Sequence, residues 1–148
     1  MSPLPPTSED ARWIARCLEL AAAVVVVDGA VVGEGQNRVE QRRSPLAHAE
    51  MEALQQALAT VGEKRLPQAV LYCTLEPCFL CAGAILHTRV RRVVFGARDP
   101  KFGAVRSLGT VLEDARLNHR CEVVEGVGGE PSAALLRAFF RQKRGGAG

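Results

Sequence analysis

Hydrophobic residues follow two different periodicities along this chain. Residues 47–60 carry Met51, Leu54 and Leu58 at spacings of three and four, which predicts an amphipathic helix. By contrast, residues 24–27 and 69–75 are short, almost continuous apolar runs. Runs of that length predict buried strands. The chain therefore mixes helices and strands.

Turn and cap residues set the ends of several elements. Thr7 or Ser8 can cap a first helix that runs through residue 20. Asp28-Gly29 separates two apolar runs and suits a type I′ turn, which predicts a hairpin. Pro77 suits the first turn of a helix, because the N–H group that it lacks would have no helical partner there.

Together these signals predict five strands and four helices. The expected strands cover residues 24–27, 30–32, 69–75, 92–95 and 121–125. The expected helices are the first one, 47–60, 78–88 and 131–144. The connecting segments are a polar loop at 33–45, a breaker segment at 62–67, and a glycine-containing loop at 99–110 with room for one short helix. This order predicts a three-layer α/β/α sandwich with a mixed five-stranded sheet.

Length and composition fit one globular domain. The chain has 148 residues, of which 47% are hydrophobic and 24% charged. We expect a single domain with loose tails at 1–8 and 145–148. The longest apolar run, residues 20–27, is too short to span a bilayer, and no signal peptide is evident. The expected location is the cytoplasm.

Cysteine usage supports that expectation. The chain has five cysteines, an odd number, and two of them form a C-x-x-C pair. This argues for a reducing compartment and against a disulfide framework. Cys17 and Cys73 lie in apolar segments and are expected in the core.

Two motifs carry the candidate chemistry: His48-Ala49-Glu50 and Pro77-Cys78-Phe79-Leu80-Cys81. His48, Cys78 and Cys81 are three ligands of the kind that zinc prefers, and Glu50 adds a carboxylate beside them. The cysteines stand one turn apart at the expected start of a helix, where positive potential favours thiolates.

The C-x-x-C pair has two other interpretations, a redox pair and half of a structural four-ligand zinc site. A redox pair is typical of a thioredoxin-like context, which the element order does not provide. A structural site needs two more ligands at short spacing. The spare candidates do not form such a pair; they are Cys73, Cys121, His87 and His119.

The combination of ligands and carboxylate predicts a hydrolytic deaminase. Zinc lowers the pKa of a water molecule, which can then attack the amidine carbon of an aromatic base. Glu50 would take the water proton and pass it to the ring nitrogen and then to the leaving ammonia. The structural alternative for Glu50 is a helix-dipole partner in the first helical turn.

The pattern H-x-E followed by P-C-x-x-C is a signature of zinc nucleobase deaminases, and longer stretches narrow the match. The sequence from about residue 30 to 144 resembles the bacterial tRNA-specific adenosine deaminases, which convert the wobble adenosine of a tRNA anticodon to inosine. The matching stretches are GEGQNR at 33–38, TLEPC at 74–78, CAGA at 81–84, RVVFGARD at 92–99, Gly109, NHR at 118–120 and FFR at 139–141.

The resemblance implies further roles. Asn37 would hydrogen-bond the flipped base, Asp99 would lie near the ribose, and the backbone of Ala49 would read the base edge. The implied substrate-binding residues are Asn37, Ala49, Pro77, Asp99, Phe140 and Arg141. The resemblance also implies one Zn²⁺ per subunit and a homodimer that binds the anticodon stem-loop. Asn37 could instead simply make an Asx turn.

The chain departs from the family at two places. Residues 20–24 join the first helix to the first strand with almost no connection, where the family has a loop that walls the base pocket. Ser44-Pro45-Leu46 stands where the family tends to have an acidic residue and a threonine. Both changes affect substrate fit and leave the metal chemistry intact.

Two alternatives to the tRNA enzyme follow. One is a deaminase of a free nucleobase or nucleoside, such as guanine, cytosine or adenine. The other is a non-catalytic zinc protein that binds RNA or another partner. Basic clusters at 42–43, 89–92 and 141–144 could contact phosphates, although each could also be a solvated surface.

Overall fold

A mixed sheet forms the centre of the molecule. The computed structural model describes residues 4–20 and 22–128, and its sheet has the strand order β2-β1-β3-β4-β5. The strands are β1 (Ala22–Val27), β2 (Ala30–Gln36), β3 (Val70–Leu75), β4 (Arg92–Ala97) and β5 (Glu122–Val124). The helices are α1 (Ser8–Leu20), α2 (Val39–Arg42), α3 (Ala49–Val61), α4 (Phe79–Thr88) and the 3₁₀ helix η1 (Val111–Glu113).

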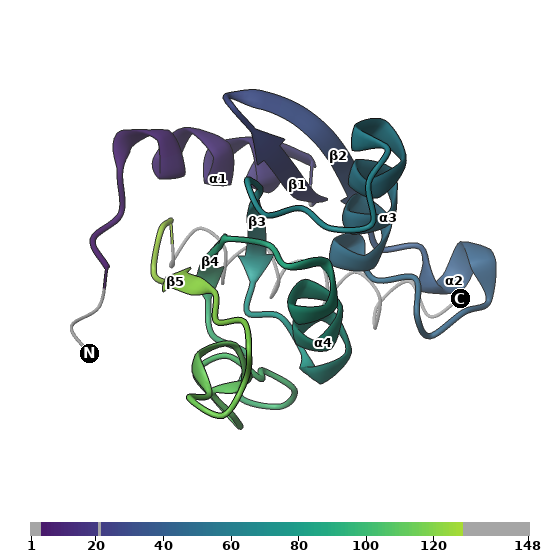
Figure 1. Cartoon of the computed structure of the whole chain (residues 1–148). Helices are drawn as coiled ribbons and strands as arrows, with labels where there is room; N and C mark the ends of the chain where they lie inside the picture. Colours follow the sequence, from purple (N-terminus) through teal and green to yellow (C-terminus); the bar gives the residue numbers. More distant parts are fainter. Residues whose placement is uncertain (1–3, 21, 129–148) are drawn as a thin grey trace.

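Helices cover both faces of this sheet (Figure 1). β1 runs antiparallel to β2 and β3, whereas β3, β4 and β5 are mutually parallel. One buried cluster lies between the sheet and α3 and α4, and a second lies between the sheet and α1. The structure confirms the expected three-layer α/β/α sandwich with a mixed sheet.

The first hairpin turns where the sequence predicts. Asp28 and Gly29 have φ values of 50° and 77°, and Val27 pairs with Ala30. Positive φ at both central residues is the requirement of a type I′ turn, which the Asp-Gly pair satisfies at low cost. Within residues 4–20 and 22–128, no helix is both long and apolar enough to cross a membrane.

α1 is tied to the sheet at its start. The Thr7 hydroxyl accepts a hydrogen bond from the Asp10 N–H group (3.1 Å), and the Asp10 carboxylate accepts one from the Thr7 N–H group (2.9 Å). This reciprocal cap confirms Thr7 as the residue that begins the helix. Asp10 is almost fully buried and also accepts hydrogen bonds from Arg92 and from the Tyr72 hydroxyl.

Residues 33–45 do not form the single loop that their polarity suggested. β2 continues to Gln36, and α2 follows after two residues. The reason is the close packing of α3 on β2. A Cβ atom at Gly33 would lie 2.2 Å from the Ala53 carbonyl oxygen, and one at Gly35 would lie 2.4 Å from the Ala49 carbonyl oxygen. These glycines let two backbones touch, so their lack of side chains indicates close approach and not a loop.

Gly35→Ala is therefore expected to displace the start of α3. The added Cβ meets backbone atoms, which cannot rotate away, and overpacking of this kind costs about 1–3 kcal/mol. Thermal denaturation should show a lower melting temperature, and zinc affinity should fall because His48 precedes this turn. Gly83→Ala is the matched control: no neighbour lies within 4 Å of the new Cβ, and α4 should be unchanged or more stable. Equal stability of the two variants would contradict the packing argument.

Two further predictions concern the connection after α1 and the loop at 99–110. α1 ends at Leu20 and β1 begins at Ala22. The connection between them is as short as the sequence predicts. The short helix expected within 99–110 lies just beyond it, as η1. The predicted helix over 131–144 lies outside the described residues.

Candidate active site

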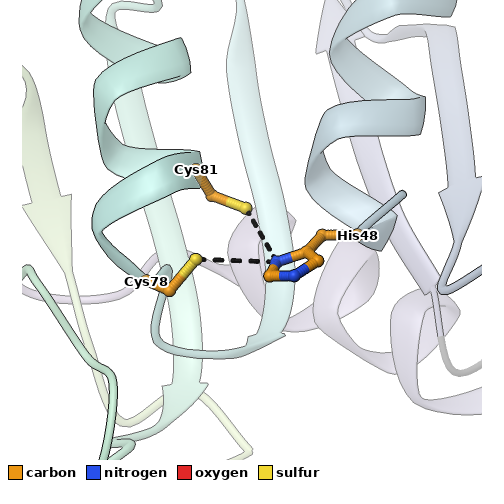
Figure 2. Close-up of side chains that lie close together, drawn as sticks. All are labelled: His48, Cys78 and Cys81. Carbon is orange, nitrogen blue, oxygen red and sulfur yellow. Dashed lines mark hydrogen bonds between the residues drawn. The ribbon is translucent and has the colours of Figure 1, made fainter. Parts of the chain in front are cut away.

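Two helix N-termini meet at the predicted metal ligands. His48 is the N-cap residue of α3 and Cys78 is the N-cap residue of α4, so both ligands stand at the start of a helix. Cys81 lies in the first turn of α4. Figure 2 shows the imidazole of His48 pointing between the two thiols. The tertiary structure thus brings together three ligands that are 30 and 33 residues apart in the sequence.

The spacing of these atoms fits a tetrahedral metal. The His48 Nδ1 atom lies 3.5 Å from the Cys78 Sγ atom and 3.5 Å from the Cys81 Sγ atom. Tetrahedral zinc bonds to nitrogen and sulfur put such atoms about 3.6 Å apart. The three ligand atoms all lie within 4.8 Å of one another. Two sulfurs and one imidazole nitrogen are also the donor types that zinc prefers.

One of the two thiols is readily deprotonated for ligation. A hydrogen bond from the Cys81 thiol lowers the pKa of Cys78 to about 5, and the N–H groups of Cys81 and Leu80 add to this effect against the cost of burial. The same shared hydrogen bond, together with burial, raises the pKa of Cys81. One thiolate is therefore present at neutral pH, held by the start of α4.

Glu50 lies beside the ligands in the first turn of α3. It is partly buried and interacts with the Cys81 thiol. Burial raises the pKa of Glu50, and the negative charge of Cys78 acts in the same direction. A carboxylate with this position can exchange protons with a molecule bound next to the ligands.

A second carboxylate, which the sequence analysis did not single out, organises the loop after β4. Glu76 is 2% exposed. Its oxygens accept hydrogen bonds from the N–H groups of Asp99, Val105, Arg106 and Ser107 at 2.6–3.0 Å, and from the Ser107 hydroxyl. Although burial raises it, these hydrogen bonds hold the pKa of Glu76 below its usual value. A single Glu before Pro77 carries no sequence signal for this role.

The same loop contacts the metal ligands. The Ala104 N–H group donates to the Pro77 carbonyl at 2.9 Å, and Gly103 forms an antiparallel bridge with Cys78. A Cβ atom at Gly103 would lie 2.3 Å from the Glu76 carboxylate carbon. The loop is thus wrapped tightly around the segment that carries Cys78.

Glu76→Ala is expected to lower the free energy of unfolding by about 3 kcal/mol or more, because each buried donor left without a partner costs about 1–3 kcal/mol. Urea denaturation of the zinc-loaded protein measures it. Ser107→Ala removes only one of the hydrogen bonds and should cost about 1 kcal/mol. A similar small loss in both variants would show that Glu76 does not hold the loop.

Two of the predicted substrate-binding residues form hydrogen bonds within their own loops. Asn37 makes the Asx turn: its Oδ1 atom accepts a hydrogen bond from the Val39 N–H group at 3.0 Å. The Oδ1 atom of Asp99 accepts from the N–H groups of Lys101 and Phe102 at 3.0 and 3.3 Å. Ala49 and Pro77 adjoin the ligands, and Phe140 and Arg141 lie outside the described residues.

The other described cysteines lie in the core, and part of the basic clusters is engaged in ion pairs. Cys17, Cys73 and Cys121 are buried outside the ligand group, and the first two confirm the predicted core positions. Several basic residues of the predicted clusters form ion pairs; these pairs are Arg42–Glu52, Arg91–Glu122 and Arg92–Asp10. The cluster at 141–144 lies outside the described residues.

Known proteins resemble this chain in sequence and fold. The profile of the MafB19-like deaminase family matches residues 14–144. The tRNA-specific adenosine deaminase of Bacillus subtilis (strain 168) is 45% identical over 122 residues, which cover 82% of this chain and 76% of that protein. The chain belongs to the tRNA-specific adenosine deaminase family. In this fold α3 and α4, which carry the candidate ligands and Glu50, lie on one face of the sheet.

Solved structures of deaminases agree with this assignment. One comes from a study of A-to-I editing by tRNA:A34 deaminases at the wobble position; it is 38% identical, with a TM-score of 0.74, and the match covers 86% of this chain and 93% of that one. Another is a mutant of the protein NE0047 in complex with 8-azaguanine, at 27% identity and a TM-score of 0.76, covering 88% and 84% of the two chains. The family fold thus serves both an RNA-editing enzyme and a protein that binds a free purine analogue.

Proposed function

We propose that this deaminase converts adenosine to inosine at the wobble position of a tRNA anticodon. The reaction consumes one water and releases one ammonia. The observation that carries the proposal is Glu50 beside the three ligand atoms, within reach of the Cys81 thiol. A purely structural zinc site needs no such carboxylate, so the non-catalytic alternative is disfavoured. The relatives that act on tRNA support the substrate.

His48, Cys78 and Cys81 would hold one Zn²⁺ in each subunit. When bound, zinc makes water acidic enough to act as a nucleophile at neutral pH. Glu50 accepts the proton of the attacking water and delivers it to the purine ring nitrogen. It then carries the second proton to the departing amino group, which leaves as ammonia.

Asn37 and Asp99 would contact the substrate through the side-chain atoms that their loop hydrogen bonds do not use. Asn37 uses Oδ1 in its own turn, so its amide nitrogen would meet the base. Asp99 uses Oδ1 in its loop, so its other oxygen would meet the ribose 2′-OH, which distinguishes RNA from DNA. The backbone of Ala49 and the Pro77 ring would border the base, and Phe140 and Arg141 would line the path of the anticodon loop.

We also propose that the enzyme acts in the cytoplasm as a homodimer with the anticodon stem-loop contacting both subunits. Light scattering after size-exclusion chromatography should give twice the 15.9 kDa mass of one chain. A monomer that edits RNA at full rate would contradict the dimer.

The deciding experiment measures inosine by mass spectrometry on an adenosine-bearing arginine tRNA anticodon stem-loop, next to a panel of free bases and nucleosides. Conversion of the RNA supports the proposal. Conversion of a small molecule alone overturns it and supports the second candidate, a free purine deaminase. That candidate is favoured by the short connection between α1 and β1 and by the relative that binds 8-azaguanine.

A further inference from the structure

Large exposed apolar side chains gather around the metal ligands. Phe79 directly follows Cys78 and is 52% exposed, and Phe102 precedes Gly103 and is 65% exposed. Leu108, whose N–H group donates to the Gly103 carbonyl, is 58% exposed. Exposed apolar groups concentrated in one place mark a binding surface more often than single scattered ones do.

Backbone contacts bring the segments that carry the two phenylalanines together. Pro77 is hydrogen-bonded to Ala104, and Cys78 is bridged to Gly103. Phe79 directly follows Cys78 and Phe102 directly precedes Gly103, so both phenylalanines adjoin the residues of this bridge. Among the described residues a ring–ring contact is found for Trp13 and Tyr72 and not for these two rings. Each ring therefore keeps exposed surface for a ligand.

The ring of Phe79 packs next to Gly109 in the loop after β4. A Cβ atom at Gly109 would lie 3.3 Å from its Cε1 and Cζ atoms, so the ring rests against the backbone of the loop. Glu76 holds that loop in place through its hydrogen bonds. A ring fixed in this way loses little conformational entropy when another flat group stacks on it.

The charge around the rings suits an anion. Lys101 adjoins Phe102, is exposed, and makes no ion pair with a described residue. The nearby carboxylates are engaged: Asp99 by backbone N–H groups, and Glu113 and Glu125 by Arg106 at 2.6 and 2.9 Å. Aromatic rings next to a cation are typical of surfaces that bind single-stranded nucleic acids.

We infer that Phe79 and Phe102 form a stacking surface for the unpaired nucleotides that flank the deaminated adenosine, with Lys101 at a phosphate. The target base must leave its stack to reach the ligands, and its neighbours then lose a stacking partner. Rings beside the ligands replace that partner. A second copy of this chain would also cover apolar side chains, but it gives no reason for the cation. The inference rests on the proposed function.

The test is a double-mutant cycle on the full-length, zinc-loaded protein. Wild type, Phe79→Ala, Phe102→Ala and the double variant are assayed on the anticodon stem-loop and on stem-loops with an abasic site next to the target adenosine. Each alanine should raise KM about tenfold, as expected for loss of one stacked base, with little change in kcat. Phe102→Tyr keeps a ring and should behave as wild type. Leu117→Ala, an exposed apolar residue away from the ligands, is the matched control.

The abasic substitution separates stacking from a general loss of fit. It should raise KM for wild type and have little further effect on the double variant, because the ring and the base form one interaction. An equal abasic effect in both proteins, or unchanged KM in the alanine variants, overturns the inference. Dissociation of the variants into monomers also overturns it and assigns the surface to a second copy. Absence of RNA conversion by wild type is a different result: it refutes the proposed function, and the inference falls with it.

Discussion

Glu50→Gln is expected to abolish nearly all deamination while the metal and the fold remain. The amide cannot accept the water proton, and general acid–base catalysis by one side chain is worth about 10²- to 10⁴-fold in rate. The substitution is nearly isosteric, and Glu50 is not a ligand, so zinc content and melting temperature should stay close to wild type. Single-turnover inosine formation on the anticodon stem-loop measures the effect.

Glu52→Gln is the matched control for this variant. Glu52 lies two positions after Glu50 in α3 and forms an ion pair with Arg42 at 3.0 Å. Glutamine keeps the size of this side chain and Glu52 is not one of the candidate ligands, so activity should remain near wild type. The acid–base assignment is wrong if Glu50→Gln turns over as fast as this control.

Cys78→Ser is expected to remove zinc and with it all activity. Cys78 supplies the thiolate that the start of α4 stabilises, and a serine hydroxyl remains protonated at neutral pH and is a poor ligand. Loss of an outer-shell partner already costs about 10- to 100-fold in metal affinity, so loss of a direct ligand should exceed 100-fold. Metal analysis by mass spectrometry should find one zinc per wild-type chain and none in the variant.

Cys121→Ser tests whether the effect is specific to the site. The Cys121 thiol donates to the Val90 carbonyl at 3.2 Å, a hydrogen bond that serine can also make. This variant should keep its zinc and its activity. A chelator should inactivate wild type, and added zinc should restore it. Full zinc occupancy in Cys78→Ser would refute the ligand set.

The candidate catalytic residues were predictable from the sequence because they lie in two short motifs. Cys78 and Cys81 share one helical turn, and His48 and Glu50 share another, so short spacings fix which side chains act together. The Asp28-Gly29 turn was likewise predictable, since its positive φ values depend on those two residues alone. The layer order followed from the alternation of helices and strands.

Contacts between distant segments were not predictable in this way. Gly33 and Gly35 indicated a loop, and only the approach of α3 shows why a strand needs them. Asn37 had two interpretations, and the structure shows the Asx turn, whereas its role toward a base stays a prediction.

What the sequence by itself determined is the fold class, the candidate ligand triad and the carboxylate beside it, because periodicity and short spacing are properties of one segment. What only the tertiary structure decided is how loops surround that centre. The hydrogen bonds of Glu76 reach 23 to 31 residues along the chain, and the bridge between Cys78 and Gly103 brings the segments of Phe79 and Phe102 together. Such contacts follow from how the loop after β4 packs against α4, which no single stretch of sequence encodes.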